Sequence, residues 1–317
     1  MDKLKIAFVG MGSIATRHFG NVCTYLDSVG IKYEIDIYRS GLGKPLADMI
    51  EKKAPRQIAL TEDLKIEEQY DVIFITNPTS LHFETLERFQ NNGKAFFIEK
   101  PVFSTNDVDV KRLSGLAGKV CYVACPLRYN PAIDYIKNNI DCTKVISARA
   151  ISSSYLPDWR PGTDYRKCYS AHEDMGGGVD IDLIHEWDYL TYLFGEVEKG
   201  YAIAGKLSDL EIDSNDIAIY IAKTEKTAVE LHLDYFGRES IRKVQLFMPE
   251  DTIECDILNG VIRYLKSGEV ITFNKERNSF QMQEIKHFFD IVFGELENDS
   301  TINHALQVLR YAKGDFR

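Results

Sequence analysis

The stretch KLKIAFVGMGSIATRH, residues 3–18, joins a short apolar run, a glycine turn and the start of an amphipathic helix. The apolar run, residues 4–9, predicts a buried β-strand. Gly10 allows the tight turn that follows, and Gly12 lets a pyrophosphate approach the backbone, where free N–H groups and the positive end of the helix hold an anion. The order of strand, GxGxxA turn and helix therefore predicts dinucleotide binding, with a plain tight turn as the alternative. The predicted cofactor contacts in this turn are Gly10, Gly12, Ser13 and Ile14.

The composition is ordinary for a soluble globular enzyme, with 317 residues, 44% hydrophobic and 27% charged, and the length suffices for two domains. A net charge of −10 argues against nucleic acid or an anionic membrane surface as the main partner. No apolar run approaches the roughly 18 residues that a membrane span needs, and the chain starts directly with a strand, so we expect a cytoplasmic protein. The six cysteines form no CxxC pair and predict neither a metal site nor a disulfide framework.

Further short apolar runs alternate with helical segments in the first half of the chain. Strands that alternate with helices predict a parallel doubly wound sheet, so the expected fold class is α/β with an N-terminal Rossmann domain. We expect this NAD(P)-binding domain to span residues 1–123, with its ligand outside the carboxyl ends of the strands. The predicted elements are strands at 33–38, 57–60, 71–75, 94–98 and 120–124, and a helix at 79–92.

The end of the second strand bears on the choice of cofactor. An acid there would bond the adenosine ribose, whereas an arginine accommodates a 2′-phosphate. The tip carries Arg39 and Ser40 and no acid, and Asp36 lies earlier in the strand. We therefore expect NADP in preference to NAD, with Arg39 and Ser40 as cofactor contacts. A solvated Arg39 that leaves either cofactor possible is the alternative.

Two polar segments follow strands that end at the same edge. TNPTSLH, residues 76–82, follows the strand at 71–75, and EKP, residues 99–101, follows the strand at 94–98. The rule for open α/β sheets places both beside the glycine turn. His82 is equally a candidate for a structural hydrogen bond, and His18 is expected to be structural. The predicted cofactor contacts from these segments are Thr76, Asn77, Pro78, His82, Glu99 and Lys100.

Three motifs of the first half occur in a fixed order: GxGxxA…H at 10–18, TNPxxxH at 76–82 and EKP at 99–101. The set resembles the glucose–fructose oxidoreductase, inositol dehydrogenase and rhizopine catabolism (Gfo/Idh/MocA) family, and the similarity extends over the whole chain. The resemblance implies that Lys100 contacts the reacting substrate hydroxyl and that the Pro101 peptide is cis, whereas a solvated loop lysine is the alternative. Arg128 begins the segment RYNP, which resembles the family's exit from its nucleotide domain, and we expect Arg128 to bind substrate.

Residues 154–174 form a long segment without obvious secondary structure, SYLPDWRPGTDYRKCYSAHED. A loop of this length is usually functional or disordered. Its aromatic side chains suit stacking on a sugar face, and its arginines suit bidentate binding of a carboxylate or phosphate. A self-packed loop or an oligomer contact is the alternative. The predicted substrate contacts here are Trp159, Arg160, Tyr165 and Arg166.

Three glycines at 176–178 open a helix that is expected to run to Gly195. At 100° per residue one stripe of this helix is apolar, and a second stripe carries ionisable or hydroxyl side chains that suit proton chemistry. A solvated polar face is the alternative. The residues of the second stripe are Asp182, His185, Glu186 and Tyr189.

The family commonly has D-x-x-x-H after such glycines, with the Asp and the His completing the site beside the lysine. In this chain His185 follows Asp182 by three residues, and Glu186 occupies the usual histidine position. The resemblance therefore implies that Asp182 and His185 serve catalysis and substrate binding. Because both spacings face the same side of a helix, whether His185 or Glu186 fills the histidine role stays open.

The second half is expected to form an α+β domain, residues 124–317, with an open and mostly antiparallel sheet. An open sheet exposes one face, and self-association would cover it, so we expect a homodimer or homotetramer through this sheet. One strand is predicted at 144–153. Residues 197–273 are expected to form repeated strands, with individual strands at 216–223, 228–235, 243–247, 252–256, 261–265 and 270–273. Two helices are expected to follow, near 279–298 and 301–313.

The predicted activity is hydride transfer between NAD(P) and a secondary hydroxyl or ketone of a sugar, sugar acid, nucleotide sugar or cyclitol. Lys100 would hydrogen-bond the reacting oxygen, and His185 would take the hydroxyl proton with Asp182 orienting it or the substrate. The alternatives are a non-enzymatic NADP-dependent sensor and an NAD-assisted glycoside hydrolase on the same fold.

Overall fold

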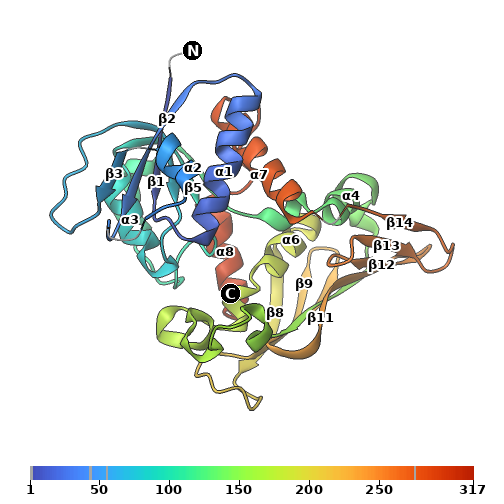
Figure 1. Cartoon of the computed structure of the whole chain (residues 1–317). Helices are drawn as coiled ribbons and strands as arrows, with labels where there is room; N and C mark the ends of the chain where they lie inside the picture. The colour runs from blue at the N-terminus through green and yellow to red at the C-terminus, as the bar shows by residue number, and fades with distance from the viewer. Residues whose placement is uncertain (1–2, 43–44, 55, 275) are drawn as a thin grey trace. The chain divides into compact units, whose positions relative to one another are not determined.

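The computed structural model describes residues 3–42, 45–54, 56–274 and 276–317, and it divides into two compact units (Figure 1). The first unit comprises residues 1–124 and 281–306, and the second comprises residues 125–280 and 307–317. The first change of unit lies next to the boundary expected near residue 123. The return of residues 281–306 to the first unit differs from the expected continuous second domain at 124–317, because an apolar helix face in this segment packs on the first sheet.

The first unit is built on a six-stranded sheet in the order β3-β2-β1-β4-β5-β6, and every neighbouring pair is parallel. This order confirms the predicted doubly wound Rossmann sheet. Its topological switch point lies between β1 and β4, whose carboxyl ends carry the glycine turn and the TNP segment. The strands are β1 (Leu4–Val9), β2 (Tyr33–Arg39), β3 (Arg56–Ala59), β4 (Tyr70–Ile75), β5 (Gly93–Ile98) and β6 (Val120–Val123).

Helices cover both faces of this sheet, which explains why its central strands are apolar and buried through residues 6–9, 72–75 and 95–98. On one face Phe8 of β1 packs on Phe19 of helix α1 (Ser13–Ser28), with ring centroids 5.6 Å apart. Helix α7 (Arg277–Val292) lies beside α1 and adds Phe288 to the same face (Figure 1). On the opposite face Phe89 of helix α3 (His82–Phe89) packs against the sheet. Helix α3 is shorter than the helix predicted at 79–92, because a 3-10 turn, Thr79–Leu81, precedes it. A short helix α2 (Asp48–Lys53) completes the set.

The second unit contains an eight-stranded sheet in the order β14-β13-β12-β11-β7-β10-β9-β8. Every neighbouring pair is antiparallel except β7 and β10, so the predicted open, mostly antiparallel sheet is confirmed. One strand, β8, was not among the individually predicted strands. The strands are β7 (Ser147–Tyr155), β8 (Val197–Gly205), β9 (Ile217–Thr224), β10 (Ala228–Asp234), β11 (Phe236–Phe247), β12 (Thr252–Asp256), β13 (Val261–Tyr264) and β14 (Val270–Thr272).

In the described part of the second unit, the helices pack on one face of this sheet. Trp187 of helix α6 (His185–Phe194) is fully buried and packs edge-on against Tyr220 of β9 at 5.2 Å. Other α-helical segments of the described unit are α4 (Pro131–Asn139), α5 (Val179–Asp182), the start of α7 and the end of α8 (Ile302–Ala312). Within the described ranges, no helix has both the length and the apolar character that crossing a lipid bilayer requires.

Candidate functional site

The glycine turn after β1 is fastened to the end of β4. The backbone of Gly10 has a φ of +91°, and a Cβ added there would lie 2.6 Å from the Cα of Asn77. The hydroxyl of Thr76 donates to the carbonyl oxygens of Val9 and Gly10, at 3.1 and 3.0 Å. The turn therefore needs glycine at position 10 both for its conformation and for the close approach of the TNP segment. Thr76, predicted to contact cofactor, has its hydroxyl engaged in holding this turn.

The N-terminus of α1 is open to a ligand. Gly12 is the N-cap residue, no side chain caps the helix, and a Cβ added to Gly12 would meet no atom within 4 Å. Gly12 and Ser13 are both exposed. Uncapped helical N–H groups need acceptors, and a phosphate is a suitable one. The turn thus leaves room and supplies donors where a cofactor pyrophosphate is expected.

Asn77 adds an unsatisfied acceptor beside the turn. Its Nδ2 donates to the hydroxyl of Thr85 at 2.7 Å, while its buried Oδ1 has no hydrogen-bond partner among the described residues. A buried amide oxygen without a donor is uncommon in a folded protein and indicates a missing partner. These groups fit a dinucleotide. The turn and the uncapped helix supply N–H donors for its pyrophosphate, and the Asn77 oxygen can accept from one of its hydroxyl or amide groups.

At the end of β2 the arginine and the acid are both engaged within the protein. Arg39 is 9% exposed, its Nε donates to the carbonyl oxygen of Gly41 at 2.6 Å, and its Nη1 donates to Gln57 at 3.2 Å. Asp36 lies along the strand as expected, where its carboxylate accepts from Tyr70 and pairs with Arg56. The carboxylate of Asp36 is thus directed at its own sheet, and Ser40 next to Arg39 is exposed.

Lys100 lies two residues after the end of β5, and its peptide bond to Pro101 is cis, as the resemblance implies. His82 of α3 holds this segment, with Nδ1 3.1 Å from the carbonyl oxygens of Pro101 and Val102 and Nε2 3.0 Å from that of Asn77. Burial lowers the pKa of His82 and outweighs the opposing effect of these carbonyl groups. The prediction that His82 contacts the cofactor is therefore corrected: the ring is 1% exposed and links the TNP and EKP segments.

Glu99 joins the lysine segment to the glycine-turn helix. One carboxylate oxygen is hydrogen-bonded to Nε2 of His18 on α1, and the other accepts the backbone N–H of Lys100 at 3.1 Å. Burial acts to raise the pKa of Glu99, but the hydrogen bond from His18 and the charges of His18 and Lys100 outweigh it, so that pKa lies below its usual range. Glu99, predicted to bind cofactor, is thus an ionised internal anchor, and His18 is structural as expected.

In the second unit, the three glycines allow an unusually close approach of two segments. A Cβ on Gly177 would lie 2.2 Å from the carbonyl oxygen of Tyr169, and Gly178 has a φ of +128°. The single helix predicted from here to Gly195 is instead two, because Leu183 leaves the helical conformation between α5 and α6. Of the predicted apolar stripe, Leu183, Trp187 and Leu190 are buried and Phe194 is partly buried. The alternative of a solvated polar face is wrong, since Asp182, Glu186 and Tyr189 are also buried.

Asp182 is held by two tyrosines that sequence reasoning did not connect to it. The hydroxyl of Tyr169 donates to one carboxylate oxygen at 2.7 Å, and the hydroxyl of Tyr235 donates to the other at 2.6 Å. Burial, and then the negative charge of Asp182, raise the pKa of both tyrosines. Tyr169 belongs to the long loop and Tyr235 follows β10, so Asp182 fixes the loop against the sheet while remaining the acidic group of this site.

The side chains of His185 and Glu186 have different surroundings in the structure. Glu186 is fully buried, and its carboxylate lies 2.6 Å from Nε of Arg242 on β11. Burial raises the pKa of Glu186, against the lowering effect of Arg242. His185 is half-buried at the first residue of α6. Glu186 is thus an internal anchor between helix and sheet, and of the two residues His185 is the one with an accessible side chain.

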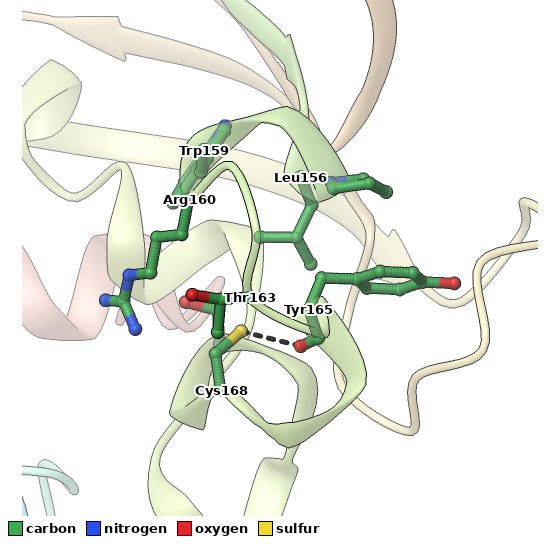
Figure 2. A pocket seen from close by; sticks show the side chains of 8 residues that line it. Leu156, Trp159, Arg160, Thr163, Tyr165 and Cys168 are labelled. Atoms are coloured by element: carbon green, nitrogen blue, oxygen red, sulfur yellow. Dashed lines mark hydrogen bonds between the residues drawn. The ribbon is translucent and has the colours of Figure 1, made fainter.

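The loop at 154–174 is built from consecutive 3-10 turns rather than lacking structure. Trp159 packs edge-on against Tyr235 with ring centroids 5.3 Å apart, and the guanidinium of Arg160 lies 5.7 Å from the ring centroid of Tyr169. Each of these side chains therefore lies against one of the two tyrosines that hold Asp182. Figure 2 shows the pocket in this loop, with the guanidinium of Arg160 directed away from Leu156 and Tyr165.

Three other residues predicted to bind substrate are engaged within the protein. Arg128 is 3% exposed and forms two hydrogen bonds to Asp188, at 3.0 and 2.6 Å, so the structure corrects its predicted role to a structural one. Arg166 pairs with Asp164 and Glu211. The hydroxyl of Tyr165 accepts the backbone N–H of Glu211 at 3.1 Å. Both arginines are thus paired with carboxylates, and the Tyr165 hydroxyl has a backbone donor.

Comparisons with known proteins agree with this fold. Residues 4–120 match a family described as "Oxidoreductase family, NAD-binding Rossmann fold". Inositol 2-dehydrogenase of Rhizobium meliloti is 28% identical over 133 residues, which cover 40% of this chain and 37% of that protein. The WlbA dehydrogenase of Bordetella pertussis, solved with NADH and UDP-GlcNAcA, is 16% identical and has a TM-score of 0.75, covering 98% of this chain and 94% of that one. The scyllo-inositol dehydrogenase of Lactobacillus casei, solved with NAD(H) and scyllo-inositol, is 17% identical with a TM-score of 0.77, covering 98% and 95%.

Proposed function

We propose that this chain is a dehydrogenase or reductase of carbohydrates, because its residues 4–120 match a family described as an oxidoreductase family with an NAD-binding Rossmann fold. The reaction is hydride transfer between a nicotinamide cofactor and a secondary hydroxyl or ketone of a sugar, sugar acid, nucleotide sugar or cyclitol. The observation that carries the proposal is the set of groups at the carboxyl edge of the Rossmann sheet. There an uncapped helix and open space at Gly12 lie at the switch point, and Lys100 follows the neighbouring strand β5.

Each candidate residue has a role that its surroundings support. The cofactor supplies the hydride acceptor or donor when it is bound. Lys100 donates a hydrogen bond to the reacting oxygen and stabilises its alkoxide character. His185 takes the hydroxyl proton, and Asp182, held by Tyr169 and Tyr235, fixes the substrate or the histidine. Trp159 offers an exposed ring for a sugar face, and Arg160 beside it offers a guanidinium for an acidic substituent.

NADP in preference to NAD remains part of the proposal. No acidic side chain stands at the tip of β2, and Asp36 is paired with Arg56 and Tyr70 inside its own sheet. Arg39 ends the strand and Ser40 follows it with an exposed side chain. An arginine and a hydroxyl at this position suit a 2′-phosphate better than they suit a ribose diol.

We also propose that a second copy of the chain covers the open face of the second sheet, in a homodimer or homotetramer. Tyr201 and Ile203 of β8 are 80% and 70% exposed, and Ile221 of β9, the register partner of Tyr201, is 64% exposed. A neighbouring group of large apolar side chains on a sheet edge favours association. Light scattering should give a multiple of the monomer mass at micromolar protein, and Tyr201→Lys combined with Ile221→Lys should reduce it, whereas a monomeric wild type refutes this proposal.

The proposed reaction is tested by the absorbance of reduced nicotinamide with a panel of sugars, sugar acids, nucleotide sugars and cyclitols. Net oxidation or reduction changes that absorbance with one or more substrates. The NADP-dependent sensor would bind cofactor without any turnover. The NAD-assisted glycoside hydrolase would release a sugar from a glycoside without a net change in absorbance. Lys100→Met serves as the control, because a signal that persists in this variant does not come from the proposed site.

A further inference from the structure

We propose that His18 is a positioning residue for Lys100, acting through the Glu99 carboxylate. Its importance for catalysis rests on the proposed function, whereas the positioning itself is a property of the chain and is testable without substrate. The juxtaposition that carries the proposal joins three groups of the first unit: the His18 imidazole, the Glu99 carboxylate and the backbone N–H of Lys100.

Glu99 is placed so that its carboxylate can act on the next residue. Its backbone N–H donates to the carbonyl oxygen of Ile75 at 2.9 Å, which extends the pairing of β5 with β4 by one residue. The backbone of Glu99 is therefore fixed by the sheet, while its side chain turns back over the start of the lysine segment. The carboxylate oxygen that accepts the Lys100 N–H, at 3.1 Å, thereby sets the direction in which the chain leaves the sheet.

His18 in turn holds the carboxylate. The imidazole is 1% exposed and its Nε2 is hydrogen-bonded to Glu99, whose side chain is 12% exposed. The ring stands edge-on to Phe97 of β5, with centroids 4.9 Å apart, so its orientation is fixed by packing as well as by the hydrogen bond. An ionised carboxylate with so little access to water needs such a donor, and loss of the donor leaves the oxygen to find water or to rotate.

The same contact ties Lys100 to the cofactor turn. His18 belongs to α1, whose first residues supply the N–H groups proposed to bind the pyrophosphate. A rigid helix therefore connects the anion site to the lysine through one side chain. Misplacement of a catalytic group by as little as 1 Å costs on the order of 10²-fold in rate. Removal of the His18 contact should for this reason lower turnover more than it lowers cofactor affinity.

The test compares His18→Leu, which removes the donor, with His18→Gln, which keeps an N–H near the position of Nε2. Asn21→Leu is the matched control, because Asn21 lies on the same helix, is 3% exposed and has an Nδ2 without a partner among the described residues. Amide hydrogen exchange of Lys100 is measured by NMR without cofactor or substrate. We expect exchange at Lys100 to be about tenfold or more faster in His18→Leu, and near the wild-type rate in His18→Gln and Asn21→Leu.

The kinetic arm uses whichever substrate shows turnover. We expect kcat to fall by about tenfold or more in His18→Leu, with KM for the cofactor changed less than about threefold, and to recover in His18→Gln. If His18→Leu does not fold, Glu99→Gln replaces it and should accelerate Lys100 exchange in the same way. Exchange at Lys100 that stays within twofold of wild type in a folded variant overturns the proposal, as does equal acceleration in His18→Gln. Accelerated exchange in a protein without any turnover would retain the positioning role and reject the proposed function.

Discussion

Gly10 and Asn77 lie so close together that a Cβ on Gly10 would stand 2.6 Å from both the Cα and the backbone nitrogen of Asn77. This contact joins the turn after β1 to the segment after β4, at the switch point of the Rossmann sheet. Gly12, two residues later, has no atom within 4 Å of the corresponding position. The two glycines of one motif are therefore required for different reasons. Gly10 is required by the fold, and Gly12 is required by the open space in which the cofactor pyrophosphate is proposed to bind.

The difference predicts distinct effects of alanine at the two positions. Gly12→Ala should fold with a stability close to that of the wild type. Its cofactor affinity should fall by about tenfold or more, because the added methyl group would clash with the pyrophosphate. Gly10→Ala should destabilise the fold by about 1–3 kcal/mol, because its φ of +91° and the contact with Asn77 both oppose a side chain. Urea unfolding and fluorescence titration with reduced cofactor measure the two properties. A Gly12→Ala protein with wild-type cofactor affinity would contradict the pyrophosphate assignment.

Lys100→Met should strongly reduce turnover and preserve cofactor binding. The methionine keeps most of the side-chain volume but cannot donate a hydrogen bond to the reacting oxygen, so kcat should fall on the order of 10²- to 10⁴-fold. Cofactor affinity should change little. Steady-state kinetics and a binding titration on the same preparation check both. Full turnover in this variant would remove Lys100 from the mechanism.

Replacement of the two neighbouring residues of α6 should separate catalysis from stability. His185→Asn should lower kcat by tenfold or more with little loss of stability, since the side chain is only half-buried. Glu186→Gln should cost about 2 kcal/mol of unfolding free energy, because the fully buried carboxylate lies 2.6 Å from Arg242. The reverse pattern would indicate that Glu186 carries the proton chemistry.

Arg39→Ala tests the cofactor preference. If Arg39 contacts a 2′-phosphate, KM for NADP should rise by tenfold or more while KM for NAD changes little. Because Arg39 also donates to Gly41 and Gln57, Gln57→Ala is the control for a local loosening of the loop. Equal changes in both KM values would show that Arg39 does not distinguish the cofactors.

Asp216 should make the second unit sensitive to acid. Its side chain is fully buried and accepts the backbone N–H groups of Leu207 and Ser208 and the Ser208 hydroxyl. Burial acts to raise the pKa of Asp216, but these hydrogen bonds outweigh it, so the pKa lies below its ordinary value of 3.8. The folded-state pKa is thus the lower one, and the stabilisation is present above the unfolded pKa and is lost as pH falls through the folded pKa.

Asp216→Asn should therefore be less stable than wild type by about 1.5–3 kcal/mol at pH 7, because one acceptor oxygen replaces two. The difference should stay constant down to about pH 5 and shrink below about pH 4. Urea unfolding of both proteins across this range measures it. A difference that does not depend on pH would show that the Asp216 carboxylate is not ionised in the folded protein.

Local patterns predicted the fold well because its determinants lie close together in sequence. The apolar runs at β1, β4 and β5 and the glycine turn specify a parallel sheet within each βα unit, and the structure confirms them. The return of α7 to the first unit was not predictable in the same way, because it depends on contacts such as Phe288 with Phe74, far apart in the chain.

The site was harder to predict where a side chain's partner comes from a distant element. Asp182 accepts from Tyr235, 53 residues away, and Arg128 pairs with Asp188, 60 residues away. No spacing in the sequence reveals such pairs, so Arg128 was interpreted as a substrate contact. His82 was misinterpreted for a related reason, since its acceptors are backbone carbonyl groups, which any sequence provides. Lys100 was a candidate on local grounds, because it lies two residues after the end of β5, and its role in the site stays a prediction.

The most direct test of the central claim is transfer of deuterium from reduced cofactor to product. The protein is mixed with NADPH or NADH carrying deuterium at the transferable position of the nicotinamide and with the keto forms of the candidate sugars or cyclitols, and the product alcohol is analysed by mass spectrometry. Hydride transfer predicts one deuterium bound to the carbinol carbon of the product, formed far more slowly by the Lys100→Met control. Deuterium retained entirely in the cofactor, with every ketone unchanged although the cofactor is bound, would contradict the assignment of this chain as an oxidoreductase of carbohydrates.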